Sequence, residues 1–268
     1  MSLRLPALVD CLIALRIIPP AAVAQLDGSQ APTAQAVLDA GRLAEQTCRF
    51  LDDTAPSVAL IARMGQDLSQ FGLTYSHLGF ALRLANGEWG VRHLLNMHSA
   101  GHSSIYEEGM VNFYSDNPFR FEAAVISLPA AVQGPLLQVL KDKALRLHCR
   151  SYSLTSHPWS LSTQNSNQWV LEVLAAALAG AEHRVRPQLQ DWLKASGYAP
   201  SELAVSLPTQ WAGPLLKDSI SFADQPALTR RQGRVHTVTV DSVEAWLQGE
   251  TSPFGADRAQ CRTTHLHL

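Results

Sequence analysis

Apolar residues along this chain recur at two spacings, one typical of helices and one typical of strands. Helical spacing predicts helices over residues 34–52, 130–149, 186–200 and 241–249, and another that begins near 165–168. Short apolar or alternating runs predict strands over residues 58–62, 75–84, 89–96, 120–127 and 233–240. Because helices and strands are interspersed along the chain, the pattern predicts an α+β fold.

The clearest pair of predicted strands flanks Asn86-Gly87, a dipeptide that tolerates the positive φ angles of a tight hairpin turn. A strict two-residue loop there would place Asn96 opposite His77. A loop lengthened by a bulge would shift the register and bring His93 opposite His77 instead. The hairpin therefore offers two candidate partners for His77, of which His93 is favoured and Asn96 is the alternative.

Length and charge limit the classes of function. The chain has 268 residues with a formal net charge of -2, and 46% of its residues are apolar, which is typical of a globular protein. Its tightest basic group is Arg230, Arg231 and Arg234, more typical of a solvated turn than of a nucleic-acid surface, so no nucleic-acid partner is predicted. No apolar run reaches the roughly 20 residues of a membrane span, so no integral membrane segment is expected in the mature chain.

The N-terminal residues have features of a signal peptide. Arg4 precedes an apolar stretch, and residues 22–24 fit a small-x-small cleavage site, although Asp10 and Arg16 interrupt the stretch. We expect residues 1–30 to be a signal peptide or flexible leader, which implies a periplasmic or exported protein. If this segment is not cleaved, it is a short helix of a cytoplasmic protein. Residues 31–250 are expected to form a single domain, and residues 251–268 a C-terminal tail.

The cysteines and histidines do not predict a metal site. The four cysteines include no C-x-x-C pair, and their spacing fixes no disulfide pairing. Two pairs have i, i+4 spacing, His98 with His102 and Cys261 with His265, but Gly101 interrupts the first and the second lies in the expected tail. We therefore predict neither a metal nor any other cofactor.

Ser166 lies where a polar run passes into a long apolar helix, "TQNSNQWVLEVLAAALAG". Asn165 and Ser166 are both residue types that commonly cap a helix. The same position also suits a nucleophile, because a helix N-terminus offers free N–H groups and a partial positive charge. Cys149 is another possible nucleophile, but the residues that follow it have no helical pattern.

A nucleophile needs a base, and His77 is the best candidate. It begins a predicted strand, and Gly79 two residues later permits close packing against the sheet. A polar residue on the neighbouring strand would orient its imidazole, which again points to His93 or Asn96. The aromatic-rich segment 104–121 is expected to be a loop or short helix at the surface. Glu107 and Glu108 are adjacent in this segment, so on a helix their carboxylates would point in different directions and would not form a common site.

Four segments in this order resemble a bacterial family catalogued as domain of unknown function 2145. They are "ALIARMGQDLSQFGLTYSHLGFALR", "VRHLLN", "QNSNQWVLEVLAAAL" and "VTVDSVEAWL", and the resemblance covers about residues 48–247. The family looks related to circularly permuted papain-like proteins of the NlpC type. The resemblance implies a small antiparallel sheet packed against helices, and a site made from His77, His93 and Ser166.

The resemblance also bears on function. It implies an amide or ester hydrolase, or an acyl transferase, but papain-like enzymes have Cys where this chain has Ser166. The chain is therefore an enzyme with a serine nucleophile, a catalytically inactive member of the fold that serves as a binding module at the cell envelope, or a chain with an engineered Ser. Tyr75, Gln164 and Asn165 are the expected substrate-binding residues. The substrate is a small molecule or a peptide of undetermined identity, and the oligomeric state is open.

Overall fold

A six-stranded antiparallel sheet forms the centre of the computed structural model, which describes residues 32–97, 101–142, 144–179, 185–206 and 219–268. Its strand order is β4-β3-β2-β1-β5-β8. The strands are β1 (Val58–Arg63), β2 (His77–Arg83), β3 (Trp89–Asn96), β4 (Ser103–Gly109), β5 (Glu122–Ile126) and β8 (Thr263–His267). A separate two-stranded hairpin consists of β6 (Ser201–Ala204) and β7 (Arg234–Thr237). The predicted α+β class is thus confirmed, while the expected leader over residues 1–30 lies outside the described residues.

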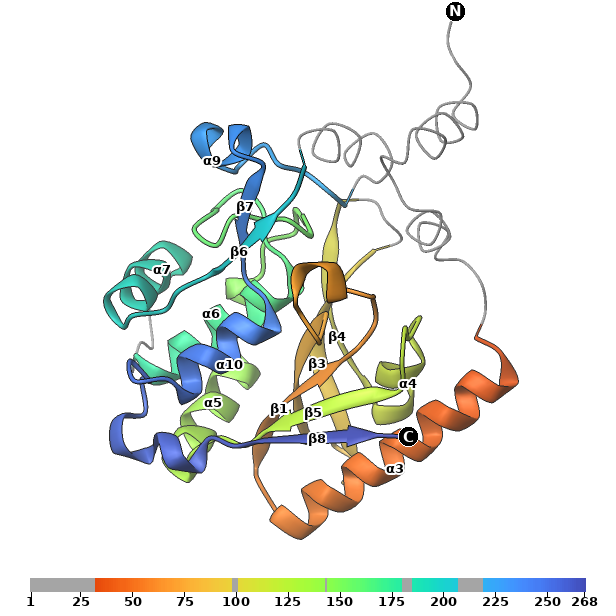
Figure 1. Cartoon of the computed structure of the whole chain (residues 1–268). Coiled ribbons are helices and arrows are strands. Elements are labelled where there is room, and N and C mark those ends of the chain that lie inside the picture. Colours follow the sequence, from red (N-terminus) through yellow and green to blue (C-terminus); the bar gives the residue numbers. More distant parts are fainter. Residues whose placement is uncertain (1–31, 98–100, 143, 180–184, 207–218) are drawn as a thin grey trace, which may run out of the picture.

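Helices cover both faces of the main sheet, so the fold has three layers (Figure 1). One face packs against α3 (Ala34–Thr54) and α4 (Met110–Ser115). The other face packs against α6 (Ser166–Leu178) and the helices around it, which are α5 (Ala130–Asp142), α7 (Arg186–Ala195) and α10 (Val240–Gln248). Shorter helical segments are η1 (Ser69–Phe71), η2 (Ala144–Leu147), α9 (Ala227–Arg231) and η3 (Gly255–Gln260). None of the described helices is long and apolar enough to cross a membrane.

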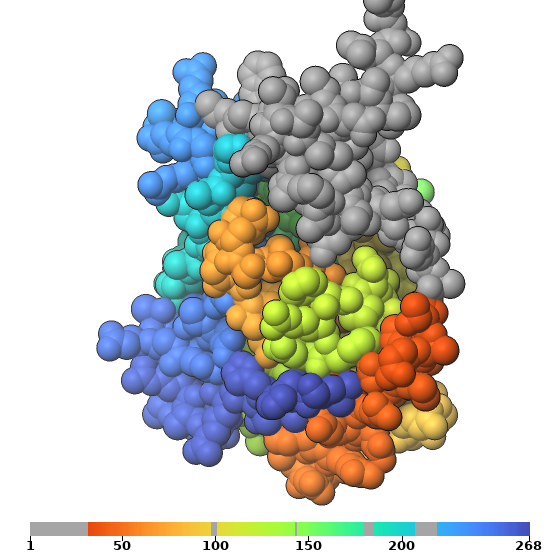
Figure 2. All heavy atoms as spheres, turned by 45° about the vertical axis from the view of Figure 1, so that its right-hand side comes forward, coloured from red at the N-terminus to blue at the C-terminus, as the bar shows by residue number. Residues whose placement is uncertain are grey.

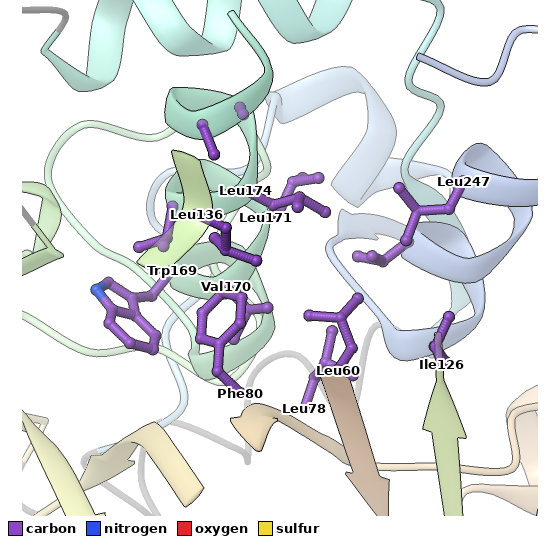
Figure 3. Packing of buried hydrophobic residues seen from close by; sticks show 14 of the residues in the cluster. Leu60, Leu78, Phe80, Ile126, Leu136, Trp169, Val170, Leu171, Leu174 and Leu247 are labelled. Atoms are coloured by element: carbon purple, nitrogen blue, oxygen red, sulfur yellow. The ribbon is translucent and has the colours of Figure 1, made fainter. Parts of the chain in front are cut away.

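Helix α6 lies at the centre of the larger core. Every residue from Ser166 to Ala177 is buried, so this helix is enclosed on all sides rather than amphipathic. Figure 3 shows side chains of α6, such as Trp169 and Leu174, facing Phe80 and Leu60 of the sheet. The ring of Phe80 meets that of Trp169 edge to face, with centroids 5.7 Å apart. This packing fixes the position of the N-terminus of α6 against the sheet.

The β2–β3 hairpin has a three-residue connection rather than a strict two-residue loop. The N–H of Leu84 donates to the Glu88 carbonyl at 2.8 Å, and Gly87 adopts a φ of 84° between them. The register accordingly pairs Phe80 with Arg92 and does not place Asn96 opposite His77. The loop is longer than two residues, but the shift is too small to bring His93 opposite His77. His93 lies beside Gly79 instead, two positions from His77 on the same face.

Two edge strands were not predicted. Residues 103–109, expected to be loop or short helix, form β4 at one edge of the sheet before α4 begins. The expected tail is also wrong in its last part, since residues 263–267 form β8 and pair with β5 at the other edge. Figure 2 shows these dark-blue C-terminal residues as a band beside the orange-red α3. Helix α10 begins at Val240, one residue earlier than expected, and Thr239 is its N-cap.

Candidate functional site

A cavity lies at the end of the main sheet where β2 and α6 both begin. Its volume is about 290 Å³. His77, the first residue of β2, and Ser166, the first residue of α6, both line it. The β6–β7 hairpin supplies a further part of the wall through residues such as Leu203 and Val235. Two of the predicted site residues, distant in sequence, therefore open on one cavity.

His77 and His93 form a hydrogen-bonded pair of imidazoles. Their Nε2 and Nδ1 atoms are 2.8 Å apart, and the two rings meet edge to face. Gly79 makes this approach possible, because a Cβ atom there would lie 2.7 Å from a Val91 methyl and 3.1 Å from the His93 Cβ. The structure thus brings together the two histidines that the sequence pattern pairs.

Glu108 of β4 is the residue that the sequence analysis missed. Its Oε1 lies 2.9 Å from His93 Nε2, which extends the pair into a chain of His77, His93 and Glu108. The neighbouring Glu107 instead pairs with Arg92. In a strand, adjacent side chains point to opposite faces, so the two glutamates serve different partners.

The carboxylate at the end of this chain determines where the ring protons lie. An ionised carboxylate only accepts hydrogen bonds, so His93 donates to Glu108 through Nε2–H. When His93 is neutral, its Nδ1 is the unprotonated nitrogen and accepts a hydrogen bond from His77 Nε2–H. This arrangement leaves an unprotonated lone pair on His77 Nδ1, for which no hydrogen-bond partner is found among the described residues.

The surroundings of His77 keep its imidazole neutral. Burial lowers the pKa of His77 well below the usual value of 6.5, and the positive charge of nearby Arg63 lowers it further. Arg63 pairs with His77 in the β1–β2 register, forms an ion pair with Asp116 and lies over the ring of Phe113. A neutral buried imidazole with a free nitrogen has the properties of a general base.

Ser166 is held at the start of α6 by the residues on each side of it. Asn165 is the N-cap, and its Oδ1 accepts a hydrogen bond from the N–H of Gln168 at 2.7 Å. Asn167 ties the helix to β2, because its Oδ1 accepts from the N–H of Leu78 at 3.0 Å. Capping is thus the role of Asn165, which leaves the Ser166 hydroxyl available for another contact.

The phenol of Tyr152 is a neighbour of that hydroxyl. Burial raises the pKa of Tyr152 to about 12, and its interaction with Ser166 opposes this rise. The rings of His77 and His93 pack against Phe113 on the α4 face of the sheet, whereas α6 packs on the other face. Among the described residues no hydrogen bond joins Ser166 to His77, although both line the cavity.

The other predicted residues divide into two groups. Asn96, Tyr75 and Asn165 line the cavity, and the Tyr75 hydroxyl lies 2.8 Å from His265 Nδ1 of β8. Gln164 is different, because it is completely buried and does not line the cavity. Its side chain bonds to the N–H of Cys149 and to the Glu172 carboxylate, so it holds buried structure together.

The cysteines of the described residues do not contribute to the cavity. The described ones, Cys48, Cys149 and Cys261, are free thiols, and none lines it. The sulfur of Cys149 lies 3.5 Å from the Ser162 carbonyl. Cys149 is therefore not the nucleophile of this site.

The His98–His102 pair, one of the two pairs with i, i+4 spacing, cannot be assessed, because His98 lies outside the described residues. Where the structure is described, no three His, Cys, Asp or Glu side chains gather as a metal site requires.

Fold and site together define a class of protein: an α+β protein with a hydrogen-bonded His-His-Glu chain, the first histidine of which lines a cavity beside a helix that begins with Ser. The chain belongs to the bacterial family described as "Uncharacterized protein conserved in bacteria (DUF2145)", which matches residues 50–247. No curated protein and no solved structure matches this chain significantly.

Proposed function

We propose that this protein is an acyl-transfer enzyme, an amide or ester hydrolase or an acyl transferase, with Ser166 as nucleophile and His77 as general base. The observation that carries the proposal is the hydrogen-bonded chain of Glu108, His93 and His77, whose last member lines the same cavity as Ser166. Buried ionisable groups at a cavity are costly and concentrate at functional sites. Glu108 and His93 are positioning residues, and His77 and Ser166 are the reacting groups.

The reaction would proceed through an acyl-enzyme. Ser166 Oγ attacks the acyl carbonyl carbon while its proton moves to His77 Nδ1, which gives a tetrahedral oxyanion and an imidazolium. The leaving group departs with the proton from His77, and an acyl–Ser166 ester remains. Water or another acceptor then attacks that ester in the same way and restores Ser166.

The start of α6 suits the oxyanion that forms in each step. The first N–H groups of a helix have no partner within the helix, and a positive partial charge gathers there. Ser166 and Asn167 contribute two such groups at the cavity. The Tyr152 hydroxyl, which stays protonated because burial raises its pKa to about 12, is a further donor beside Ser166.

The chain order of these residues supports a circularly permuted papain-like arrangement. His77 precedes the nucleophile position, His93 follows on the adjacent strand, and a later buried helix begins with residue 166. A serine in place of the usual Cys changes the chemistry, because its hydroxyl is far less acidic than a thiol. The proton must therefore be removed by His77 during the attack rather than before it.

A catalytically inactive binding module is the second candidate function. The observation in its favour is that the Ser166 hydroxyl contacts Tyr152 and forms no hydrogen bond with His77 among the described residues. The His77 ring and α6 lie on opposite faces of the sheet, so the first candidate requires the Ser166–His77 contact to form past the end of the sheet, where both residues line the cavity. The same cavity would then bind a ligand without transforming it.

Covalent labelling with a fluorophosphonate distinguishes the two functions. We expect the parent chain to be labelled at Ser166, because an activated serine attacks this electrophile. Labelling should be lost in Ser166→Ala and kept in Ser76→Ala, which removes another serine from the cavity wall. An unlabelled parent, together with strong labelling of Ser166→Cys by a thiol-directed electrophile, would show that the site is inactive.

The pH dependence of labelling tests the role of His77. The base must be unprotonated, and a lowered pKa keeps it unprotonated at lower pH. We therefore expect the labelling rate constant to stay constant as the pH falls to 6.5 and to decline only below that value. Arg63→Met removes a nearby positive charge and should move the decline to higher pH. A parent midpoint at or above pH 6.5 would contradict a lowered pKa for His77, and a midpoint that Arg63→Met leaves unchanged would mean that another group is the base.

A further inference from the structure

The cavity has two chemically different ends. Ser166, His77 and Asn167 form a polar end where α6 and β2 begin. Apolar side chains of the β6–β7 hairpin and of the segment before β2 form another wall, which contains Phe71, Leu73, Leu203, Val205 and Val235. The reacting groups of the proposed function thus lie next to an apolar compartment.

Strand alternation in the hairpin directs this apolar wall inward. Leu203 and Val205 line the cavity, whereas the intervening Ala204 is exposed. Val235 is completely buried, and it packs with Val205 and Phe222 in a small separate core. The wall is therefore a built part of the hairpin rather than a chance exposure of single side chains.

The charged side chains of the cavity neutralise one another. Arg63 and Asp116 are the described lining residues with a full charge, and they form an ion pair. His77 is kept neutral by its surroundings. A ligand with a carboxylate or an ammonium group would lose its hydration there without gaining a free partner of opposite charge.

We infer that the apolar wall binds the hydrocarbon chain of a neutral acyl compound, an ester or amide of medium chain length. This inference rests on the proposed function for the position of the carbonyl group, which lies at Ser166. The cavity volume of about 290 Å³ is at the small end of the range for ligand pockets, which limits the chain to a medium length. A charged peptide substrate does not fit this lining.

Binding to the Ser166→Ala variant tests the inference without any reaction. Ligand-observed NMR would measure butanamide, hexanamide and octanamide, with octylammonium as the charged ligand of equal length. Each buried methylene favours binding by about fourfold, so octanamide should bind at least tenfold more tightly than hexanamide. Octylammonium should bind at least tenfold more weakly than octanamide. Equal affinities along the amide series, or preferred binding of octylammonium, would overturn the inference.

Two adjacent substitutions show whether the ligand lies at the hairpin. Leu203→Asp places a carboxylate on the cavity wall and should weaken octanamide binding at least tenfold. Ala204→Asp places the same charge on the exposed side of the strand and should leave binding within twofold. Equal effects of the two variants would overturn the placement. Chain-length dependence without fluorophosphonate labelling would refute only the proposed enzyme, and labelling without chain-length dependence would refute only this inference.

Discussion

Replacing Glu108 with Gln should slow fluorophosphonate labelling of Ser166 by about 10³ to 10⁴-fold, although the side chain does not line the cavity. Gln is nearly the same size, but its amide group can donate a hydrogen bond to His93 Nε2. His93 would then carry its proton on Nδ1 and donate to His77 Nε2. His77 would in turn hold its proton on Nδ1, where the proposed base needs a lone pair.

Two measurements separate this effect from a loss of structure. Nitrogen-15 NMR of the His77 ring should show unprotonated Nδ1 in the parent and protonated Nδ1 in Glu108→Gln, at an unchanged melting temperature. Glu107→Gln is the matched control, because Glu107 pairs with Arg92 rather than with His93. It should label at the parent rate. If both variants label like the parent, Glu108 does not set the tautomer of His77.

The sequence alone predicts the parts of the site that lie on fully buried elements. β1 and most of β2 are buried on both faces, so they appear in the sequence as continuous apolar runs. The apolar run after Ser166 marks α6 for the same reason. His77 and Ser166 could therefore be placed at the starts of a recognisable strand and helix, and His93 within the next strand. The three-residue hairpin loop needed the structure, because the sequence is compatible with both registers.

The parts that the sequence did not reveal lie on edge strands. β4 and β8 are largely half-buried or exposed, so neither has an apolar alternation that distinguishes it from a loop. Glu108 is on β4, and this is why its contact with His93 was not predicted. Gln164 was misplaced for another reason. Its neighbours Asn165 and Ser166 line the cavity, but its own side chain points away from the cavity and donates a hydrogen bond to the buried carboxylate of Glu172.

That buried charge makes Arg186→Leu the substitution with the largest expected effect on stability. Glu172 in α6 is fully buried, and Arg186 of α7 lies 2.7 Å from its carboxylate. Gln164 and Gln190 donate further hydrogen bonds to it at 2.6 Å and 2.9 Å. Without the guanidinium, the carboxylate would be buried with no balancing charge. We expect the free energy of unfolding at pH 8 to fall by about 3–5 kcal/mol, measured by urea denaturation.

The pH dependence of this loss identifies the carboxylate as its cause. Burial raises the pKa of Glu172 above the usual value of 4.5 despite its hydrogen-bond donors, so the folded state holds the proton over a range in which the unfolded state has released it. This group therefore favours folding at low pH, and the contribution is lost as the pH rises through the folded pKa. Removing Arg186 raises that pKa further, so the stability difference should be smaller at pH 5 than at pH 8.

A double variant and a surface variant complete the experiment. Glu172→Leu combined with Arg186→Leu removes both charges and should recover much of the lost stability, because no unpaired group remains buried. Arg49→Leu removes an exposed arginine paired with Glu45 on α3 and should change stability by at most about 0.5 kcal/mol. A loss for Arg186→Leu that is equal at pH 5 and pH 8 would mean that Arg186 acts mainly through its hydrogen bonds to the carbonyls of Ser160 and Leu161 and through packing, rather than through the charge of Glu172.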